Sequence, residues 1–310
     1  MSYDVSTLGT HVQTNEKTLL VKSVLTPKTV AKIKGAGKVM TGVKTKSQLP
    51  QMDTDAVFQD GKGCGFTPEG TTKISKREVE VGTIKVNEAL CPSDVEASFE
   101  QMNLTAGSDY TEIIFANDYS TLKTKKIAKA LEIALWKGDK ASADSQLKRF
   151  DGFLKILGAA TGVVDGNPTD ATEITKANIA DLLDAIYEVI PEDIIENDNL
   201  FVACGQEVFR AYIMAMRDKN YYKDYALDGA NNEVKIIGTN LTLFSTPGLN
   251  GTKKMVATHW DNMYFATDLL GEEDQFDLSY ATEAEEVRFK AKFKAGVQVA
   301  FPEEVVLFKL

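Results

Sequence analysis

The stretch from Asp109 to Lys137 constrains the fold most, because it has the pattern of one long helix. Ile127, Leu131 and Leu135 recur at helical spacing and form one apolar stripe. Such a helix would measure roughly 43 Å at 1.5 Å per residue, which is long for a globular chain. Gly138 follows at a position where glycine favours a left-handed helix end. The sequence therefore predicts one long helix to which separate parts of the molecule are attached.

Two segments with alternating side chains precede this helix and predict a β-ribbon. Apolar or threonine side chains alternate with other residues over 38–45 and again over 78–86, where Gly82 indicates a bulge. Residues 47–72 between them are rich in Gly and Pro and hold few side chains able to build a core. Isolated two-stranded ribbons are marginally stable in water, and long structureless loops are uncommon in compact domains. We therefore expect the ribbon to lie on another surface, such as that of a second copy of the chain.

The second half of the chain alternates helical and strand patterns, which indicates an α+β fold. Phe289, Ala291 and Phe293 alternate with lysines, so their strand should bury one face. Gly296 is expected to turn the chain before the next strand. The elements predicted from residue 179 onward are helices 179–186 and 206–217, and strands 200–204, 234–238, 241–245, 255–258, 263–266, 275–280, 287–294, 297–301 and 305–310.

Composition places the chain among ordinary soluble proteins. Its 310 residues are 43% hydrophobic and 26% charged, which fits one elaborated domain or two small ones. No apolar run approaches the roughly 18 residues of a membrane span, and no secretory signal is visible. Cys64, Cys91 and Cys204 lie far apart, which favours reduced thiols over a disulfide framework or a zinc site. Residues 1–36 are polar, and we expect a disordered tail or an arm that becomes ordered on a neighbour.

Charge is unevenly distributed along the chain. Residues 1–90 hold 13 Lys and Arg against 9 Asp and Glu, whereas the remainder holds 22 against 36. Nucleic-acid binding by the basic part is one interpretation, but its lysines are scattered and lack interleaved aromatic residues. We favour the interpretation that the basic part of one copy contacts the acidic body of another. The expected donors on the ribbon are Lys38, Lys44, Lys46, Lys62, Lys73, Lys76 and Arg77, and the expected acceptors are Glu283, Glu285 and Glu286.

Residues that could carry catalysis are few. Cys204 follows an apolar strand and precedes Gly205 and a helix, as in a nucleophile elbow, but the full G-x-C-x-G pattern and a nearby base are lacking. His11 and His259 are too far apart in sequence to indicate a triad or a two-histidine metal site. His259 beside Trp260 is better explained as structural. We therefore predict no catalytic residue, no cofactor and no metal.

The order of these parts is similar to that of the major capsid proteins of tailed bacteriophages, which have the Hong Kong 97-like fold. Residues 130–139, followed by Phe150–Leu154, resemble the end of the family's spine helix and the segment after it. Ala180–Tyr187 resembles part of its A-domain core. Ile236–Pro247 resembles its strand pair, and Val287–Leu310 resembles its C-terminal ending. The resemblance covers roughly residues 37–310.

This resemblance implies a division of the chain into five parts. Residues 1–36 would be an N-terminal arm, and 37–88 an extended E-loop β-ribbon. Residues 89–154 would form the first part of a P-domain with the spine helix, 155–270 a mixed α/β A-domain, and 271–310 the closing strands of the P-domain. Because only 36 residues precede the ribbon, we expect a separate scaffolding protein in place of a fused scaffolding domain.

The resemblance also implies a structural function. The chain would self-assemble into hexamers and pentamers of an icosahedral shell that encloses double-stranded DNA, within a virion assembled in the host cytoplasm. Implied partners are identical subunits, a portal, the scaffolding protein and decoration proteins, with non-specific DNA proximity and no membrane. Two alternatives remain: the shell of an encapsulin-type protein compartment, and an α/β enzyme that uses Cys204.

Overall fold

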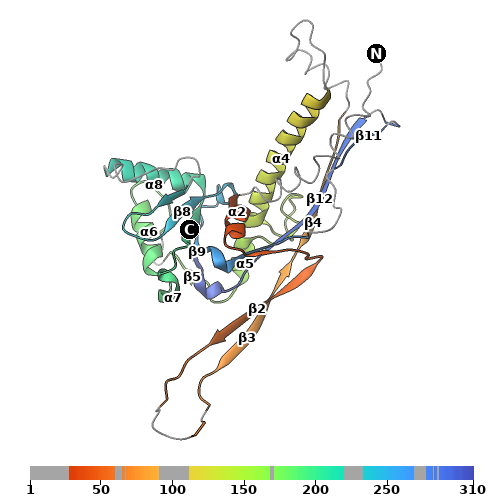
Figure 1. Cartoon of the computed structure of the whole chain (residues 1–310). Helices are drawn as coiled ribbons and strands as arrows, with labels where there is room; N and C mark the ends of the chain where they lie inside the picture. The colour runs from red at the N-terminus through yellow and green to blue at the C-terminus, as the bar shows by residue number, and fades with distance from the viewer. Residues whose placement is uncertain are drawn as a thin grey trace.

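The structure is a computed structural model of the chain, and it describes residues 28–59, 65–66, 68–90, 112–167, 171–219, 233–268, 277–281, 283–284 and 286–310. A mixed body lies at the centre. A long helix and neighbouring strands extend from it in one direction, and a two-stranded ribbon projects in another (Figure 1). The α+β class expected from the sequence is confirmed.

The predicted long helix is present as α4, Glu112–Lys137. Ile127, Leu131 and Leu135 are all buried, which confirms the apolar stripe. The expected start at Asp109 lies outside the described residues. The stripe packs into a core that also contains Phe289 and Phe293 from the longest strand, so the helix and that strand support one another.

The expectation that Gly138 ends this helix in a left-handed conformation is wrong, because Gly138 has no positive φ. A different constraint applies. A Cβ at this position would lie 2.5 Å from the Phe150 carbonyl oxygen and 2.6 Å from the Ala134 carbonyl oxygen. Gly138 therefore allows the segment after the helix to return close against the helix end, where the Gly152 N–H donates to the Gly138 carbonyl at 2.9 Å.

A six-stranded sheet forms the centre of the body. In order across the sheet, its strands are β5 Val164–Asp165, β13 Val306–Phe308, β9 Met255–His259, β6 Leu200–Cys204, β8 Thr242–Ser245 and β7 Glu233–Lys235. Alternate residues of β6 belong to two cores: Phe201 and Ala203 face α4, whereas Val202 faces helices α6, Ile179–Glu188, and α8, Gln206–Asp218. Burial on both faces explains the unbroken apolar run that predicted this strand.

A second sheet is built around the 14-residue strand β12, Glu286–Val299. The end nearest the body pairs with β10, Met263–Ala266, which in turn pairs with β1, Val39–Met40. The rest of β12 pairs with β4, Gly82–Leu90, and its first five residues also pair with β11, Asp277–Ala281, on the other side. The predicted turn at Gly296 is wrong: the strand continues through it, and a Cβ there would overlap the Glu80 carbonyl oxygen.

The ribbon consists of β2, Lys46–Thr54, and β3, Thr72–Glu80, paired antiparallel over nine positions. The strand expected over 38–45 is therefore wrong apart from β1, since Gly42 has φ +77 and breaks the run. No bulge occurs at Gly82. The chain leaves the ribbon at Val81, and β4 begins at Gly82, where a Cβ would overlap the Arg149 carbonyl oxygen.

Helix α2, Lys28–Gly35, corrects the expectation for the end of the N-terminal arm. Thr29, Val30 and Ile33 are completely buried on the chain's own core, so this part of the arm is neither a disordered tail nor dependent on a neighbour for its packing. Few of its positions are apolar, and polar contacts with α4 add to its packing, including the Thr29 N–H that donates to Glu132.

The remaining helical elements are short. They are α5 Phe153–Ala159, α7 Glu192–Ile195 and the 3-10 turns η2 Pro247–Leu249, η3 Trp260–Asn262 and η4 Pro302–Glu304. The five-part division of the chain stays a prediction. Strand β13 comes from the segment expected to close the P-domain, yet it pairs with β9 in the sheet of the body.

Candidate functional site

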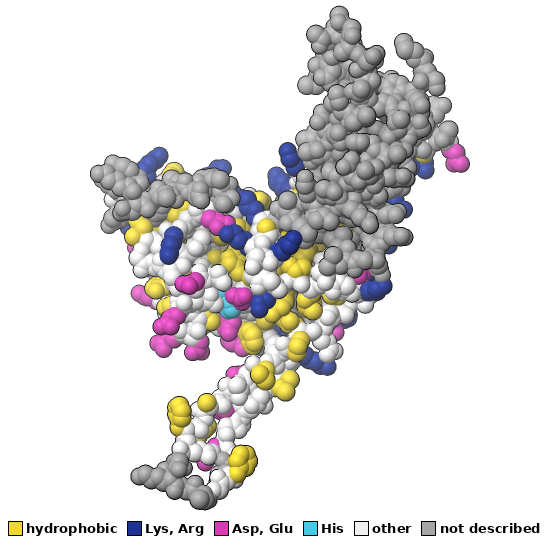
Figure 2. All heavy atoms as spheres, in the orientation of Figure 1, with side chains coloured by type: hydrophobic (Ala, Val, Ile, Leu, Met, Phe, Trp, Pro, Cys, Tyr) yellow, Lys and Arg dark blue, Asp and Glu magenta, His cyan; other side chains and the backbone are white. Residues whose placement is uncertain are grey.

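The ribbon carries the most exposed apolar side chains in the described chain. Met52 and Ile74 are directly opposite each other in the register, and they are 66% and 78% exposed. Beyond them, Phe58 is 100% and Phe66 91% exposed. Figure 2 shows hydrophobic side chains on the projecting ribbon. Several large apolar side chains exposed together on one projecting element indicate a site of interaction.

The opposite face of the ribbon is attached to the chain's own body. Leu49 and Val79 lie on this face and are buried in a small core together with Ala266 and Ala300. Because neighbouring residues of a strand point to opposite faces, burial of Leu49 leaves Met52 on the solvent side. The ribbon root is therefore fixed to the subunit while its other face and its tip are available to a partner.

Polar contacts reinforce this attachment. The Gln298 amide donates to the Glu78 carbonyl oxygen at 2.6 Å and accepts from Arg77 at 3.5 Å. The Gln51 amide donates to the Ala300 carbonyl oxygen. Burial lowers the pKa of the Arg77 guanidinium, whereas Glu303 acts in the opposite direction. Arg77, one of the expected donors, therefore has its hydrogen-bond partner at the ribbon root of its own chain.

The tip is closed by Asp55. Its carboxylate accepts hydrogen bonds from the Thr71 N–H at 2.5 Å and the Thr71 hydroxyl at 3.3 Å. Its own N–H donates to the Thr71 carbonyl at 3.2 Å. One step toward the body, the hydroxyls of Thr54 and Thr72 are 3.0 Å apart. These contacts hold the two arms of the tip together and leave Phe58 and Phe66 outside the pairing.

The contact residues expected from charge fall into different settings. Lys38 lies 3.9 Å from Asp261 and Lys46 lies 2.5 Å from Glu78, so both have partners in the same chain. Lys44 is exposed. Lys73 and Lys76 are exposed on β3 and form no ion pair with another described residue. Lys62 lies outside the described residues.

The expected acceptor cluster lies far from the ribbon within one subunit. Glu283 is exposed at the turn between β11 and β12, at the opposite end of the molecule from β2 and β3 (Figure 1). Glu286 pairs with Arg288 at 2.6 Å. Glu285 lies outside the described residues. The structure therefore does not bring the expected donors and acceptors together within one chain, and their contact between copies stays a prediction.

A buried polar cluster connects α2 to α4 and to η2. Glu132 of α4 is almost completely buried. Its carboxylate accepts from the Thr29 N–H at 3.3 Å, from the Thr29 hydroxyl, and from the Thr246 hydroxyl at 2.7 Å. The Trp136 indole N–H also donates to the Thr29 hydroxyl at 3.0 Å. Burial raises the pKa of Glu132, and the hydrogen bonds from Thr29 and Thr246 offset part of that increase.

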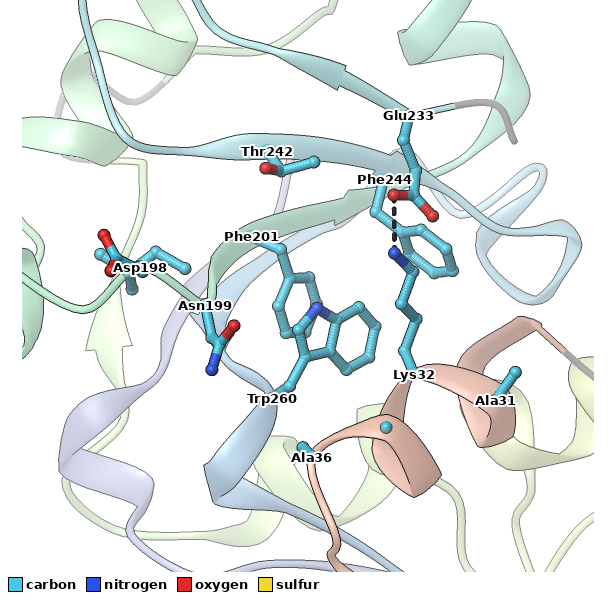
Figure 3. Close-up of a pocket in the computed structure, with 12 residues that line it drawn as sticks. Ala31, Lys32, Ala36, Asp198, Asn199, Phe201, Glu233, Thr242, Phe244 and Trp260 are labelled. Atoms are coloured by element: carbon cyan, nitrogen blue, oxygen red, sulfur yellow. Dashed lines mark hydrogen bonds and ion pairs between the residues drawn. The ribbon is translucent and has the colours of Figure 1, made fainter. Parts of the chain in front are cut away.

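A hollow of about 300 Å³ lies on the other side of α2. Figure 3 shows Lys32 of α2 extending across it to Glu233, with an Nζ–Oε2 distance of 2.7 Å. Trp260 stacks on Phe201 within the hollow, with ring centroids 3.7 Å apart, and Phe244 meets Trp260 edge-on at 5.3 Å. The Lys32–Glu233 pair ties α2 to β7 at the edge of the six-stranded sheet, and the aromatic contacts tie Trp260 to β6 and β8.

The candidate catalytic residues do not form an active site. Cys204 is completely buried, and burial raises the pKa of its thiol, which keeps it protonated. The His259 Nε2 lies 2.9 Å from Glu304, and this pair links the end of β9 to η4. Within the described residues, no group of three His, Cys, Asp or Glu side chains could hold a metal ion. No described helix is both long and apolar enough to cross a membrane.

Sequence reasoning located the ribbon but missed its apolar residues. Met52 lies within the segment 47–72 that was expected to lack structure, whereas β2 extends to Thr54. Because 21 residues separate Met52 from Ile74, their pairing becomes evident only from the observed register. One signal was available: Val57-Phe58 and Phe66 are large apolar residues in a segment that cannot build a core of its own.

Comparison with known proteins adds evidence on the fold. No protein-family model matches the sequence, and no curated protein does. Solved structures do. A chain of the satellite phage P4 procapsid, determined with the size determination (Sid) protein, superposes with a TM-score of 0.57 at 12% identity, covering 90% of this chain and 96% of that one. The chain has the fold of phage capsid proteins.

Two further capsid structures agree with this assignment. The capsid of cyanophage P-SCSP1u has a TM-score of 0.52 at 11% identity, with 88% of this chain and 85% of that chain covered. The capsid of Myoviridae phage XM1 has a TM-score of 0.51 at 13% identity, with 89% and 90% covered. The capsid fold predicted from the order of sequence elements is confirmed, and identities this low establish the fold alone.

Proposed function

We propose that this chain is the major capsid subunit of a tailed bacteriophage. Identical copies would form hexamers and pentamers of an icosahedral shell that encloses double-stranded DNA. The observation that supports this function best is the capsid fold combined with a projecting ribbon whose apolar side chains lack cover from their own subunit. We also propose that the protein is located in the capsid of the virion and that assembly takes place in the host cytoplasm.

The ribbon geometry favours contact with another copy over folding back. Its root is buried at Leu49 and Val79, and its tip projects away from the body (Figure 1). Burying apolar surface contributes about 25 cal/mol per Å², so covering Phe58, Phe66, Met52 and Ile74 would favour association. A donor ribbon that contacts a different acceptor surface makes a head-to-tail contact, which closes into rings when the rotation permits.

Charge is proposed to contribute to docking rather than to most of the affinity. Lys73 and Lys76 are exposed donors that form no ion pair with another described residue, and Glu283, Glu285 and Glu286 are the proposed acceptors. Individual exposed pairs contribute at most about 1 kcal/mol. Salt screens such charges over about 8–10 Å, so raising the salt concentration should slow initial assembly.

The proposed assembly also requires other components. A portal, a separate scaffolding protein and decoration proteins would act with the shell, and packaged DNA would contact it without sequence preference. Cargo distinguishes this function from an encapsulin-type compartment, because a phage shell would contain DNA and an encapsulin would contain protein. No described residue arrangement favours the enzyme alternative.

Electron microscopy of the purified protein tests the proposal. Shells, rings or tubes are expected for the unmodified chain. A variant in which Asn-Gly replaces residues 55–71 keeps a short hairpin turn between Thr54 and Thr72, and it should stay soluble and folded without closing shells. Glu192→Ala, an exposed change on α7, is the matched control and should assemble normally. A chain that stays monomeric in the presence of phage scaffolding components would refute the function.

A further inference from the structure

A basic slot lies between α4, β4 and the segment that joins α4 to α5. Its volume is about 330 Å³. Four cations from these three elements line it: Lys85 of β4, Lys123 and Lys126 of α4, and Arg149 of the joining segment. None of the described residues that line it is Asp or Glu. Because the chain as a whole carries a formal net charge of −10, this group of cations is a local reversal of its charge.

Most of these cations are not neutralised by a described carboxylate. Lys85, Lys126 and Arg149 are exposed and form no ion pair with another described residue. Lys123 pairs with Glu88; burial, followed by repulsion from Lys126, lowers the pKa of Lys123. These two lysines are three residues apart on one helix and are therefore neighbours on its surface, which is unfavourable for like charges. An anion in the slot would offset this repulsion.

The uncharged lining residues also suit a phosphate-bearing ligand. Ser145 and Gln146 are both exposed, and they add a hydroxyl and an amide that can donate hydrogen bonds. Lys, Arg, Ser and Gln are among the side chains that contact phosphate oxygens and sugars in complexes of proteins with DNA. Ile84, Leu131 and Phe293 form an apolar floor, against which a sugar ring can pack.

Nucleic acid fits this lining better than an acidic protein segment does. Duplex DNA carries one negative charge per about 1.7 Å of its axis, so that several phosphates can meet the three exposed cations at once. An acidic side chain brings only one charge, and a protein segment would need several of them within the same span. The lack of carboxylates in the described lining also favours a polyanion, because a carboxylate there would repel it.

We propose that the basic slot binds phosphate groups of the packaged DNA backbone. Lys85, Lys126 and Arg149 contact the phosphate oxygens, and the sugar packs on the apolar floor. Binding does not depend on base sequence, because phosphate contacts carry no sequence information. This inference rests on the proposed shell function and goes further by naming the surface of the subunit that contacts DNA.

Binding of a fluorescent DNA duplex to the unassembled chain, measured at several salt concentrations, tests the site. Each phosphate that a protein neutralises contributes about −0.9 to the slope of log affinity against log salt concentration. The slot variant carries Lys85→Ala, Lys126→Ala and Arg149→Ala. Its slope should be shallower by about 2–3, and it should bind the duplex at least about tenfold more weakly at low salt.

A matched control removes the same charge outside the slot. Lys34→Ala, Lys235→Ala and Lys309→Ala replace three exposed lysines that do not line it. This control should change the slope by less than about 1. Circular dichroism of both variants confirms that the chain is folded. Equal losses of slope and affinity in the two variants would overturn the slot as the binding site.

Two competitors of the duplex identify the source of the anion. Inorganic triphosphate represents a free phosphate ligand, and polyglutamate represents an acidic protein segment. The duplex is expected to bind more tightly than either of them. Triphosphate that needs the slot cations while the duplex does not would overturn the contact with DNA. Polyglutamate that binds more tightly than the duplex would overturn it as well and would assign the slot to a protein partner.

Photo-cross-linking in DNA-filled particles separates this contact from the function itself. The photoreactive residue p-benzoylphenylalanine replaces Gln146, which lines the slot, and in a control chain it replaces Glu192, which is exposed on α7. A cross-link to DNA is expected at Gln146 and none at Glu192. Filled particles with no cross-link at Gln146, or an equal one at Glu192, would overturn the slot while leaving the shell function intact. A chain that binds the duplex through the slot but forms no shell, ring or tube with scaffolding components would overturn the shell function while leaving a phosphate site.

Discussion

Glu132 offers a sharp test of how α2 is attached to the rest of the chain. Glu132→Ala removes the acceptor for the Thr29 N–H and for two hydroxyls. The hydroxyls can rotate to other partners, whereas the backbone donor at the start of α2 cannot. One orphaned buried donor costs about 1–3 kcal/mol, and the lost packing adds to it, so we expect a loss of about 3 kcal/mol in the free energy of unfolding.

Glu132→Gln separates the shape of this side chain from its charge. The amide keeps an oxygen acceptor and similar size, so its free energy of unfolding should stay within about 1 kcal/mol of the native chain at neutral pH. The pKa of Glu132 is raised above its ordinary value of 4.5 mainly by burial. Its protonation therefore adds stability that is complete below the unfolded pKa and is lost as pH rises through the folded pKa.

The pH dependence gives this prediction a defined sign. The native chain should gain stability relative to Glu132→Gln as pH falls from neutral toward the ordinary glutamate value. Urea unfolding of the unassembled subunit, followed by tryptophan fluorescence, measures this difference at several pH values; Trp136 contacts Thr29 and reports on the cluster. A Gln variant as unstable as the Ala variant, or a difference that does not change with pH, would refute the reasoning.

Three further substitutions test the ribbon, a close backbone contact and the buried cysteine. Ile74→Ala should change the free energy of unfolding of the subunit by less than about 0.5 kcal/mol but lower particle yield. Val79→Ala should instead lower the free energy of unfolding by about 1–3 kcal/mol, measured by urea unfolding, because its side chain is completely buried. Equal effects of the two substitutions on stability would contradict a ribbon with one buried and one exposed face. Gly248→Ala should lower the melting temperature measured by calorimetry, because a Cβ would overlap Trp136, and an unchanged melting temperature would show that η2 can shift. Cys204→Ala should leave particle yield intact in electron microscopy, since a buried cysteine acts as a small apolar residue, and any activity lost with it would revive the enzyme alternative.

Elements with a complete local pattern were predictable from sequence. The helical spacing of Ile127, Leu131 and Leu135 required a helix facing one core, and the apolar run Leu200–Cys204 required a strand buried on both sides. In each case the pattern of apolar residues along the chain matches the burial that the structure shows. Helix α2 has only Val30 and Ile33 as large buried apolar residues, so its position depends on Glu132 and Trp136, which lie about a hundred residues further on.

The candidate site was predictable only in outline. The coreless segment showed that a ribbon needs an outside surface, but alternation alone set the first strand too early, because Gly42 ends that run and β1 pairs with β10 instead. The group of cations that lines a slot beside α4 has no local signature at all. Ile84, Lys126 and Arg149 line the same slot only because β4, α4 and the following loop converge.

Strand β12 has a mechanical consequence. Its 14 residues span about 46 Å at roughly 3.3 Å per residue, and nine consecutive residues from Val287 to Ala295 pair with β4. A force that pulls along this strand loads those nine pairs simultaneously in shear, so that none can open before its neighbours. The other end is held in the same way by β10. Tension applied at the far end of β11 and β12 would therefore be carried into the centre of the subunit without unzipping the sheet.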